Sequence, residues 1–165
     1  MNLLSVDPGL THTGYAIFEI EPVPKRHGLP KYESITLKFY DAISPKKKYP
    51  IPKKLHDIYF TLFDVIHNHQ ITDIALETPF LGKNAQSFLK LGYIRGLLLL
   101  LAEVHGLAVH EFPPQVVKKA VTGNGFSDKQ AVFEAVQRVF PYLEEPKLYD
   151  ISDAIAVGIC AYRLF

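Results

Sequence analysis

Four acidic residues stand at positions where carboxylates can do chemistry. Asp7 ends the first apolar run of the chain, and Glu77 ends a later one. Short apolar runs that stop at turn residues are typical of strands, so both acids are predicted at strand ends. Asp150 and Asp153 are three residues apart, which places them on one face of a helix near the positive end of its dipole.

If that helix crosses the ends of the two strands, the four carboxylates converge. Such a cluster repels itself and needs cations. All-oxygen ligands favour Mg²⁺, with Mn²⁺ as a substitute, and two ions about 3.5 to 4 Å apart would clamp the attacking water and the leaving oxygen of a phosphodiester. The alternatives are local. Asp7 would cap the Pro8-Gly9 turn, and one of Asp150 and Asp153 would cap the helix while the other would only complement the dipole in its first turn.

A mixed sheet is the scaffold that these positions require. The predicted strands span residues 3–7, 15–18, 32–41, 72–77 and 107–112, with the first three in an antiparallel meander. The predicted helices span residues 54–69, 85–105, 113–118, 128–140 and 150–162, the fourth capped by Ser127 or Asp128. Strand and helix alternate in the second half, which implies a parallel part of the sheet. Proline-rich segments 21–31 and 43–53 are predicted loops, and the glycines after Asp7 are expected to let a phosphate or a metal come close.

Composition indicates one globular domain over residues 1–165, with 48% hydrophobic residues and a mean hydropathy of +0.07. The net charge of +1 is uninformative, so clustering matters more. Basic residues gather at Lys25-Arg26, Lys46-Lys47-Lys48, Lys53-Lys54 and Lys118-Lys119. Cys160 is the single cysteine, no signal peptide is visible, and the run 97–102 is too short to span a bilayer. These features predict a cytoplasmic protein.

Four segments carry a family resemblance: VDPGLTHTGYAIF, ALETPFLGKNAQSFLKLGYIRG, VHEFPPQVVKKAVTGNGFSDKQAV and DISDAIAVGICAY. In this order they resemble the RuvC family of Holliday junction resolvases, within the RNase H-like (retroviral-integrase-like) nuclease superfamily. The resemblance implies an α/β RNase H-like fold, a five-stranded mixed sheet flanked by helices. The segment between the second strand and the first helix is longer than in common bacterial members, and Thr78-Pro79 is an unusual lead into Phe80.

The resemblance also implies roles for single residues. Asp7, Glu77, Asp150 and Asp153 match the family's catalytic metal-binding positions. Phe80 matches the aromatic that the family places against an unstacked base, although a core anchor for its loop is the alternative. The implied DNA-binding positions are Lys118 and Lys129, with Lys83, Asn84 and Lys119 as neighbours.

The implied activity is metal-dependent endonucleolytic resolution of four-way DNA junctions in recombination and repair. Water would attack in line and leave a 5′-phosphate and a 3′-hydroxyl, and a twofold homodimer would supply the paired nicks. The helix 85–105, with Gly92 and Gly96, is the predicted dimer interface, and branch-migration proteins of the RuvA and RuvB type are further partners that the resemblance implies.

Three other functions remain open from the sequence. They are an ATP-binding domain of the actin-like sugar kinase class, another RNase H-like nuclease acting on RNA or other DNA, and a non-catalytic junction-binding module. The histidines are assigned no catalytic role: His12 is predicted on a surface turn, His67 and His69 face different ways on a helix, and His110 belongs to a strand.

Overall fold

The computed structural model describes residues 1–21, 35–78, 85–145 and 148–164. Its strands are β1 (Asn2–Asp7), β2 (Thr13–Ile20), β3 (Ile35–Ile43), β4 (Asp73–Glu77) and β5 (Ala108–Phe112). Its helices are α1 (Ile51–Asn68), α2 (Ala85–His105), α3 (Pro114–Thr122), α4 (Lys129–Val139) and α5 (Tyr149–Leu164). The strands form one sheet in the order β3-β2-β1-β4-β5, antiparallel between β1, β2 and β3 and parallel between β1, β4 and β5. The predicted five-stranded mixed sheet is therefore confirmed.

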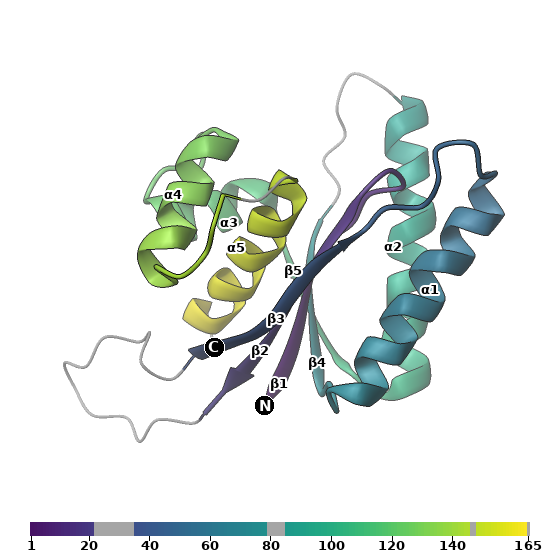
Figure 1. The fold of residues 1–165 in the computed structure, drawn as a ribbon, viewed down its shortest axis with the longest axis horizontal. Helices are drawn as coiled ribbons and strands as arrows, with labels where there is room; N and C mark the ends of the chain where they lie inside the picture. The colour runs from purple at the N-terminus through teal and green to yellow at the C-terminus, as the bar shows by residue number, and fades with distance from the viewer. Residues whose placement is uncertain (22–34, 79–84, 146–147, 165) are drawn as a thin grey trace.

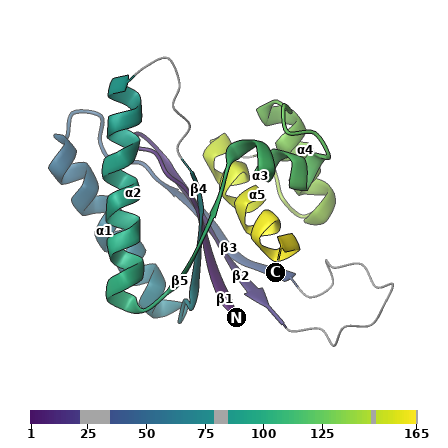
Figure 2. The same cartoon turned by 180° about the vertical axis from the view of Figure 1, so that it is seen from behind.

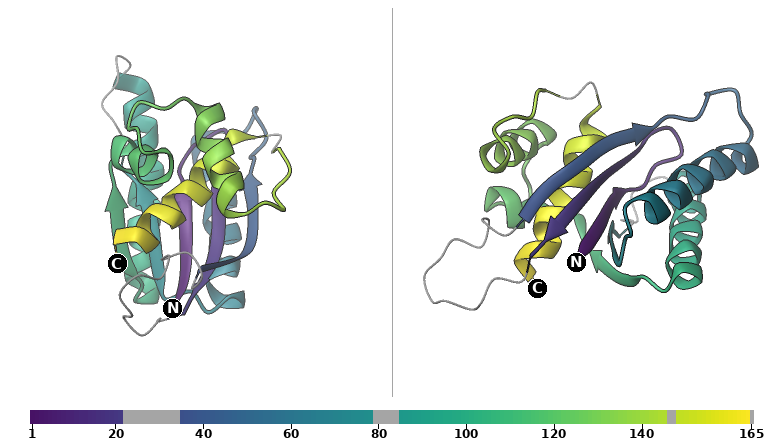
Figure 3. Two further views of the ribbon diagram at one scale, coloured as in Figure 1. Left: turned by 90° about the vertical axis from the view of Figure 1, so that its left-hand side faces the viewer. Right: turned by 60° about the horizontal axis from the view of Figure 1, so that its bottom comes forward.

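Helices cover both faces of this sheet (Figure 1). α1 and α2 pack on one face, and α3, α4 and α5 lie on the other, as the view from behind also shows (Figure 2). The alternation of strand side chains explains the two cores. In β1, Leu3 belongs to the core under α5, whereas Leu4 and Val6 belong to the core under α1 and α2. α5 crosses the sheet and makes its main contacts with β2 and β1 (Figure 3).

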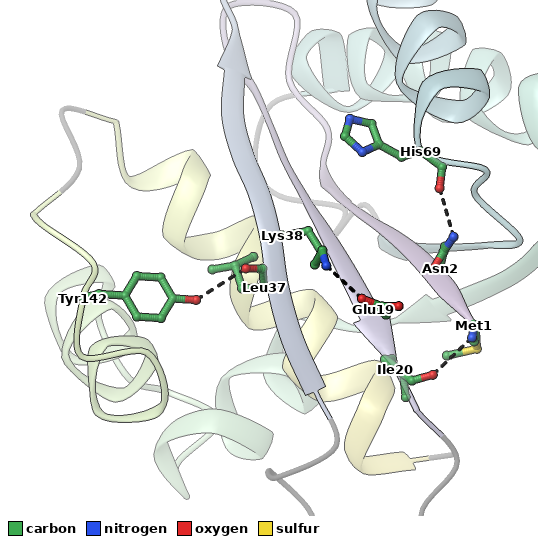
Figure 4. Close-up of polar contacts among 8 residues, drawn as sticks. All are labelled: Met1, Asn2, Glu19, Ile20, Leu37, Lys38, His69 and Tyr142. Carbon is green, nitrogen blue, oxygen red and sulfur yellow. Dashed lines mark hydrogen bonds and ion pairs between the residues drawn. The ribbon is translucent and has the colours of Figure 1, made fainter.

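Polar contacts tie the end of the sheet where β1 begins (Figure 4). The N-terminal ammonium of Met1 donates to the Ile20 carbonyl at 3.1 Å, and the Asn2 side chain donates to the His69 carbonyl at 3.0 Å. Lys38 pairs with Glu19 across β3 and β2 at 2.9 Å. Both of the last two side chains are about half exposed, so this ion pair adds little stability. Asp7 and Glu77 lie at the opposite end of the sheet, where β1 and β4 end.

Most elements agree with the sequence prediction, and the differences lie at the start of α1 and the end of α3. α1 begins at Ile51, although residues up to 53 were predicted as loop. Pro52 explains this difference, because proline in the first helical turn needs no N–H partner and has a helical φ already. α3 continues to Thr122, beyond the predicted end at 118, and Gly123 ends it in the left-handed conformation. Most of the predicted loop 21–31 lies outside the described residues.

No helix within the described ranges is long and apolar enough to cross a membrane.

Candidate active site

The sheet register places Asp7 and Glu77 next to each other. Val6 pairs with Leu76 in the parallel ladder of β1 and β4, and each acid is the next residue of its strand. Because side chains alternate along a strand, both acids lie on the face that α5 covers. Both carboxylates are partly buried. The prediction that both acids stand at strand ends is confirmed.

α5 brings its two acids to the same edge of the sheet. Gly14 pairs with Asp7 in the β1–β2 ladder, and a Cβ at Gly14 would collide with the backbone carbonyl of Asp150. The first turn of α5 therefore lies directly on the strand pair that holds Asp7. Since α5 begins at Tyr149, Asp150 lies inside the helix, and the alternative in which it is the N-cap is wrong.

A hydrogen bond inside the core holds the next turn of α5. The buried hydroxyl of Ser5 on β1 donates to the carbonyl of Ala154 at 2.7 Å. Ala154 directly follows Asp153, so the bond links the strand that ends in Asp7 to the helix turn that carries Asp153. Three residues of α5 that lie against the sheet are Asp150, Ala154 and Gly158, and a Cβ at Gly158 would collide with the Phe18 ring. They recur every four residues and form one helix face.

The environment of Asp7 disfavours its charge. Burial raises the pKa of the Asp7 carboxyl well above its ordinary value, and the charge of Glu77 raises this pKa further. Asp153 and Asp150 act in the same direction, whereas Lys129 lowers it. Residues from β1, β4, α4 and α5 thus interact electrostatically at one place.

Glu77 is in a similar environment. Burial, followed by the charge of Asp153, raises the pKa of its carboxyl to about 7. The positive charges of Lys118 and Lys129 oppose this increase. A glutamate with such a pKa exchanges its proton near neutral pH, which is unusual for a carboxyl group and common at functional sites.

Lys129 forms an ion pair with one of the four acids. Its Nζ lies 3.4 Å from Oδ2 of Asp153, and its side chain is 60% exposed. Burial lowers the pKa of Lys129, but Asp153, Asp150 and Asp7 outweigh burial and raise it. Burial raises the pKa of Asp153, against the effect of Lys129 and Lys118. The two lysines therefore partly compensate the negative charge, and they do so from α3 and α4.

The donor chemistry of this cluster fits a hard divalent cation. Its four acidic side chains offer only oxygen, which Mg²⁺ and Mn²⁺ prefer. Their mutual repulsion is what a bound cation would relieve. Within the described ranges, no three His, Cys, Asp or Glu side chains are already grouped closely enough to hold an ion.

The remaining predicted positions differ in what the structure says of them. Phe80, Lys83 and Asn84 lie outside the described residues. Lys119 is exposed on α3, about 100° around the helix from Lys118. The Pro8-Gly9 turn is closed by Thr13, whose hydroxyl donates to the Gly9 carbonyl at 2.7 Å. Among the described residues, Asp7 makes no hydrogen bond to this turn.

The histidines have local partners. The His12 ring lies 2.8 Å from the Ser44 hydroxyl, and His110 lies 2.9 Å from Asp73 at the beginning of β4. His67 packs edge-on against His105, with ring centroids 4.9 Å apart. None of these rings adjoins the carboxylate cluster in the contacts that the structure gives.

Two positions that matter for the site were not recognised in the sequence. At Gly14 the backbone carbonyl of Asp150 takes up the space of a Cβ, and at Gly9 the carbonyl of His12 does so, which shows a packing reason for both glycines that the sequence did not indicate. Ser5 was treated as an ordinary strand residue. A polar residue within an apolar strand is a signal that a buried partner is needed, but its partner is 149 residues away in sequence.

Comparison with known proteins agrees with this arrangement. The family model "Crossover junction endodeoxyribonuclease RuvC" matches residues 3–161. The chain is 38% identical over 162 residues to the RuvC of Chloroherpeton thalassium, covering 98% of this chain and 82% of that protein. It is 35% identical to the RuvC of Ehrlichia canis, covering 97% and 95%. The solved structure of T. thermophilus RuvC in complex with a Holliday junction substrate has the same fold, with a TM-score of 0.81, 22% identity and coverage of 99% and 95%.

Proposed function

The chain belongs to the RuvC family and is a crossover junction endodeoxyribonuclease, and from this premise we propose that Asp7, Glu77, Asp150 and Asp153 form its catalytic site. The observation that carries this proposal is the electrostatic coupling of acids from β1, β4 and α5 at one edge of the sheet. Family membership argues against the kinase alternative and against a purely binding role. The substrate that this site cuts is the four-way, or Holliday, junction.

We propose that the four carboxylates hold two divalent cations, Mg²⁺ in the ordinary case and Mn²⁺ as a substitute. Bound ions of this kind activate a water nucleophile and stabilise the leaving oxygen of a phosphodiester. The protein supplies the oxygens from two strand ends and one helix turn. Lys118 and Lys129 lie beside these acids and would attract and orient the phosphate that is cut.

DNA contacts extend from the same edge. Lys118, Lys119 and Lys129 are proposed to bind the DNA backbone, because lysine binds phosphate through charge alone. Phe80, Lys83 and Asn84 follow Glu77 in sequence and are proposed to contact the junction centre, with Phe80 stacking on an unpaired base.

A homodimer would supply the second cut, and α2 is its proposed interface. This helix is apolar on two opposite sides. A helix that is apolar all round is normally buried on all sides. One side packs in the core through Ile94, Leu98, Leu101 and Ala102. On the other side the side chains of Leu89, Tyr93, Leu100 and Val104 are exposed by 57%, 42%, 59% and 65%. Together with Gly96 these residues form one stripe, and among the described residues nothing beyond the local helix backbone and the two chain neighbours lies within 4 Å of where a Gly96 Cβ would be. A long apolar stripe of this kind fits a second copy.

The test is cleavage of a synthetic mobile four-way junction, labelled on each strand in turn. We expect paired, symmetric nicks on opposed strands with Mg²⁺, none with EDTA, and none on duplex of the same sequence. Glu77→Gln is the control variant, which should bind the junction and fail to cut. Normal cutting by Glu77→Gln would remove Glu77 from the catalytic site. Absence of junction cleavage by folded wild type with either metal would contradict the proposed substrate.

A further inference from the structure

Phe126 is the most exposed large apolar side chain of the described residues, at 83%. Phenylalanine is usually buried, and single exposed apolar residues are common enough to mean nothing alone. Two further features of Phe126 support a function for the exposed ring. They are the hydrogen-bonded turn that carries Phe126 and the lysine-bearing helices on either side of this turn in sequence.

The turn that carries Phe126 is held in one conformation. The N–H of Phe126 donates to Oδ1 of Asn124 at 3.0 Å, and the N–H of Asn124 donates to the Thr122 hydroxyl at 3.0 Å. A Cβ at Gly125 would lie 2.9 Å from the Gln115 carbonyl oxygen, so the turn packs against the first turn of α3. The ring is therefore presented to solvent from an ordered backbone, which reduces the entropy lost when it binds something.

The turn connects the two helices whose lysines adjoin the carboxylates. Lys118 lies before it on α3, and Lys129 follows it as the first residue of α4. The Lys129 ammonium is 3.4 Å from Asp153. Phe126 is three residues from Lys129, so their Cα atoms are at most about 11 Å apart. At about 3.4 Å per base step, this distance corresponds to roughly three nucleotides along one DNA strand. Phe126 therefore lies within about three nucleotides of the lysine that would bind the cut phosphate.

We propose that Phe126 stacks on a nucleobase of the DNA strand that enters the active site, close to the phosphate that is cut. This inference rests on the proposed function. An aromatic ring on a turn that follows one lysine-bearing helix and precedes another matches single-stranded or unpaired nucleic acid, since the lysines bind phosphates and the ring binds a base of any sequence. An unpaired or opened base next to the branch point offers such a face, whereas stacked bases within a duplex do not. The dimer stripe lies on α2, across the sheet from α3 and α4, and so does not account for Phe126 (Figure 2).

The test uses Glu77→Gln protein with Ca²⁺, so that binding is measured without cutting. The probe is a four-way junction with 2-aminopurine placed in turn at each of the three positions on either side of the cut. The parent should quench fluorescence at one or two of these positions. Phe126→Ala should lose this quenching and weaken junction binding roughly 5- to 100-fold, the range of one lost base stack. Phe126→Tyr should retain both properties.

Phe60→Ala is the matched control, because Phe60 is also exposed, at 51%, and lies on α1 across the sheet. It should change neither fluorescence nor affinity. Unchanged quenching and affinity in Phe126→Ala would overturn the inference. An equal loss in Phe60→Ala, or a loss of affinity that follows dissociation of Phe126→Ala into monomers in sedimentation velocity, would overturn it as well.

Cleavage by the wild type separates this inference from the proposed function. If the wild type cuts junctions and Phe126→Ala binds like its parent, only the role of Phe126 fails. If the wild type does not cut junctions but Phe126→Ala still loses the 2-aminopurine signal and weakens binding, the proposed function fails and Phe126 remains a base contact.

Discussion

The carboxyl group of Glu77 lies where its charge is unfavourable. Burial and the nearby Asp153 raise its pKa to about 7, and Asp7 shows a shift in the same direction. These acids therefore reduce the stability of the folded chain when they are ionised. Active sites commonly lose stability in this way to keep reactive groups close together.

Replacing Glu77 by Gln should therefore stabilise the protein in EDTA at alkaline pH. The pKa of Glu77 in the folded state is above its ordinary value of 4.5. Its contribution to stability is therefore fully present below pH 4.5, where the carboxyl is protonated, and is lost as the pH rises through about 7. At about pH 8 we expect Glu77→Gln to raise the free energy of unfolding by about 1–3 kcal/mol, discounted for partial exposure. At about pH 5 the gain should be much smaller. Urea denaturation at both pH values measures it, and an equal difference at both would contradict the electrostatic cause.

Divalent cations should stabilise the wild type through the same groups. A ligand that binds only the folded state raises the melting temperature, by an amount that grows with the ratio of its concentration to Kd. At about pH 8, Mg²⁺ should raise the melting temperature of the wild type more than that of Glu77→Gln. KCl of equal ionic strength serves as the control for screening. The same increase in both proteins would mean that Glu77 does not hold the cation.

At the scale of elements, the position of α5 determines the spacing of the acids. Its contacts with Gly14, Ser5 and Phe18 follow one helix face over two turns. Asp150 and Asp153 lie at the beginning of this face, while Asp7 and Glu77 are set by the β1–β4 register. A shift of α5 along the sheet would thus move one pair of acids relative to the other.

Gly14→Ala should separate this positioning from general stability. Its methyl group would collide with the Asp150 carbonyl, so the first turn of α5 must move. We expect junction cleavage to fall about 10- to 100-fold, because small misplacement of reacting groups is costly. The Mg²⁺ concentration for half-maximal rate should rise, and junction affinity in Ca²⁺ should change little.

Gly158→Ala is the matched control for this variant. Its methyl group would collide with the Phe18 ring, two turns from Asp150, and should cost about 1–3 kcal/mol of stability. Its Mg²⁺ dependence should stay that of the wild type. Gly14→Ala that melts earlier but keeps the normal Mg²⁺ dependence would show that Gly14 has only a structural role.

The same elements show how far sequence alone reaches. The helix stop at Gly106 predicted the end of α2, and two acids at the ends of apolar runs predicted Asp7 and Glu77 at strand ends, because these signals are local. The start of α1 was missed because proline is favourable in a first turn as well as in a loop. The contact between Gly14 and Asp150 joins residues 136 positions apart, and no local pattern encodes such a distance.

The whole molecule has its acids and its exposed apolar stripe on different layers. Asp7 and Glu77 lie on the sheet face that α5 covers, and the other acids and the lysines belong to α3, α4 and α5. These three helices lie on one face of the sheet, whereas α2 covers the other face (Figures 1 and 2). One chain carries one such site, and resolving a junction takes two cuts. If two copies joined through α2, the carboxylate site of each copy would stay accessible to DNA. Binding to two opposed strands of a junction requires this accessibility.

Leu100→Glu tests this arrangement, because Leu100 is 59% exposed in the middle of the stripe. In a twofold interface the substitution buries two like charges, so we expect a micromolar-stable dimer to become a monomer, with affinity between copies reduced at least about 100-fold. Sedimentation velocity measures this. Tyr142→Glu, at a side chain 61% exposed on the opposite layer, should remain dimeric.

The functional readout is a supercoiled plasmid with an extruded cruciform, which paired cuts convert to linear DNA and single cuts convert to nicked circles. The dimer should give mainly linear product and Leu100→Glu mainly nicked circles, because each monomer cuts independently. Linear product from a monomeric Leu100→Glu would show that pairing of the cuts does not depend on α2, and a monomeric wild type would remove the interface altogether.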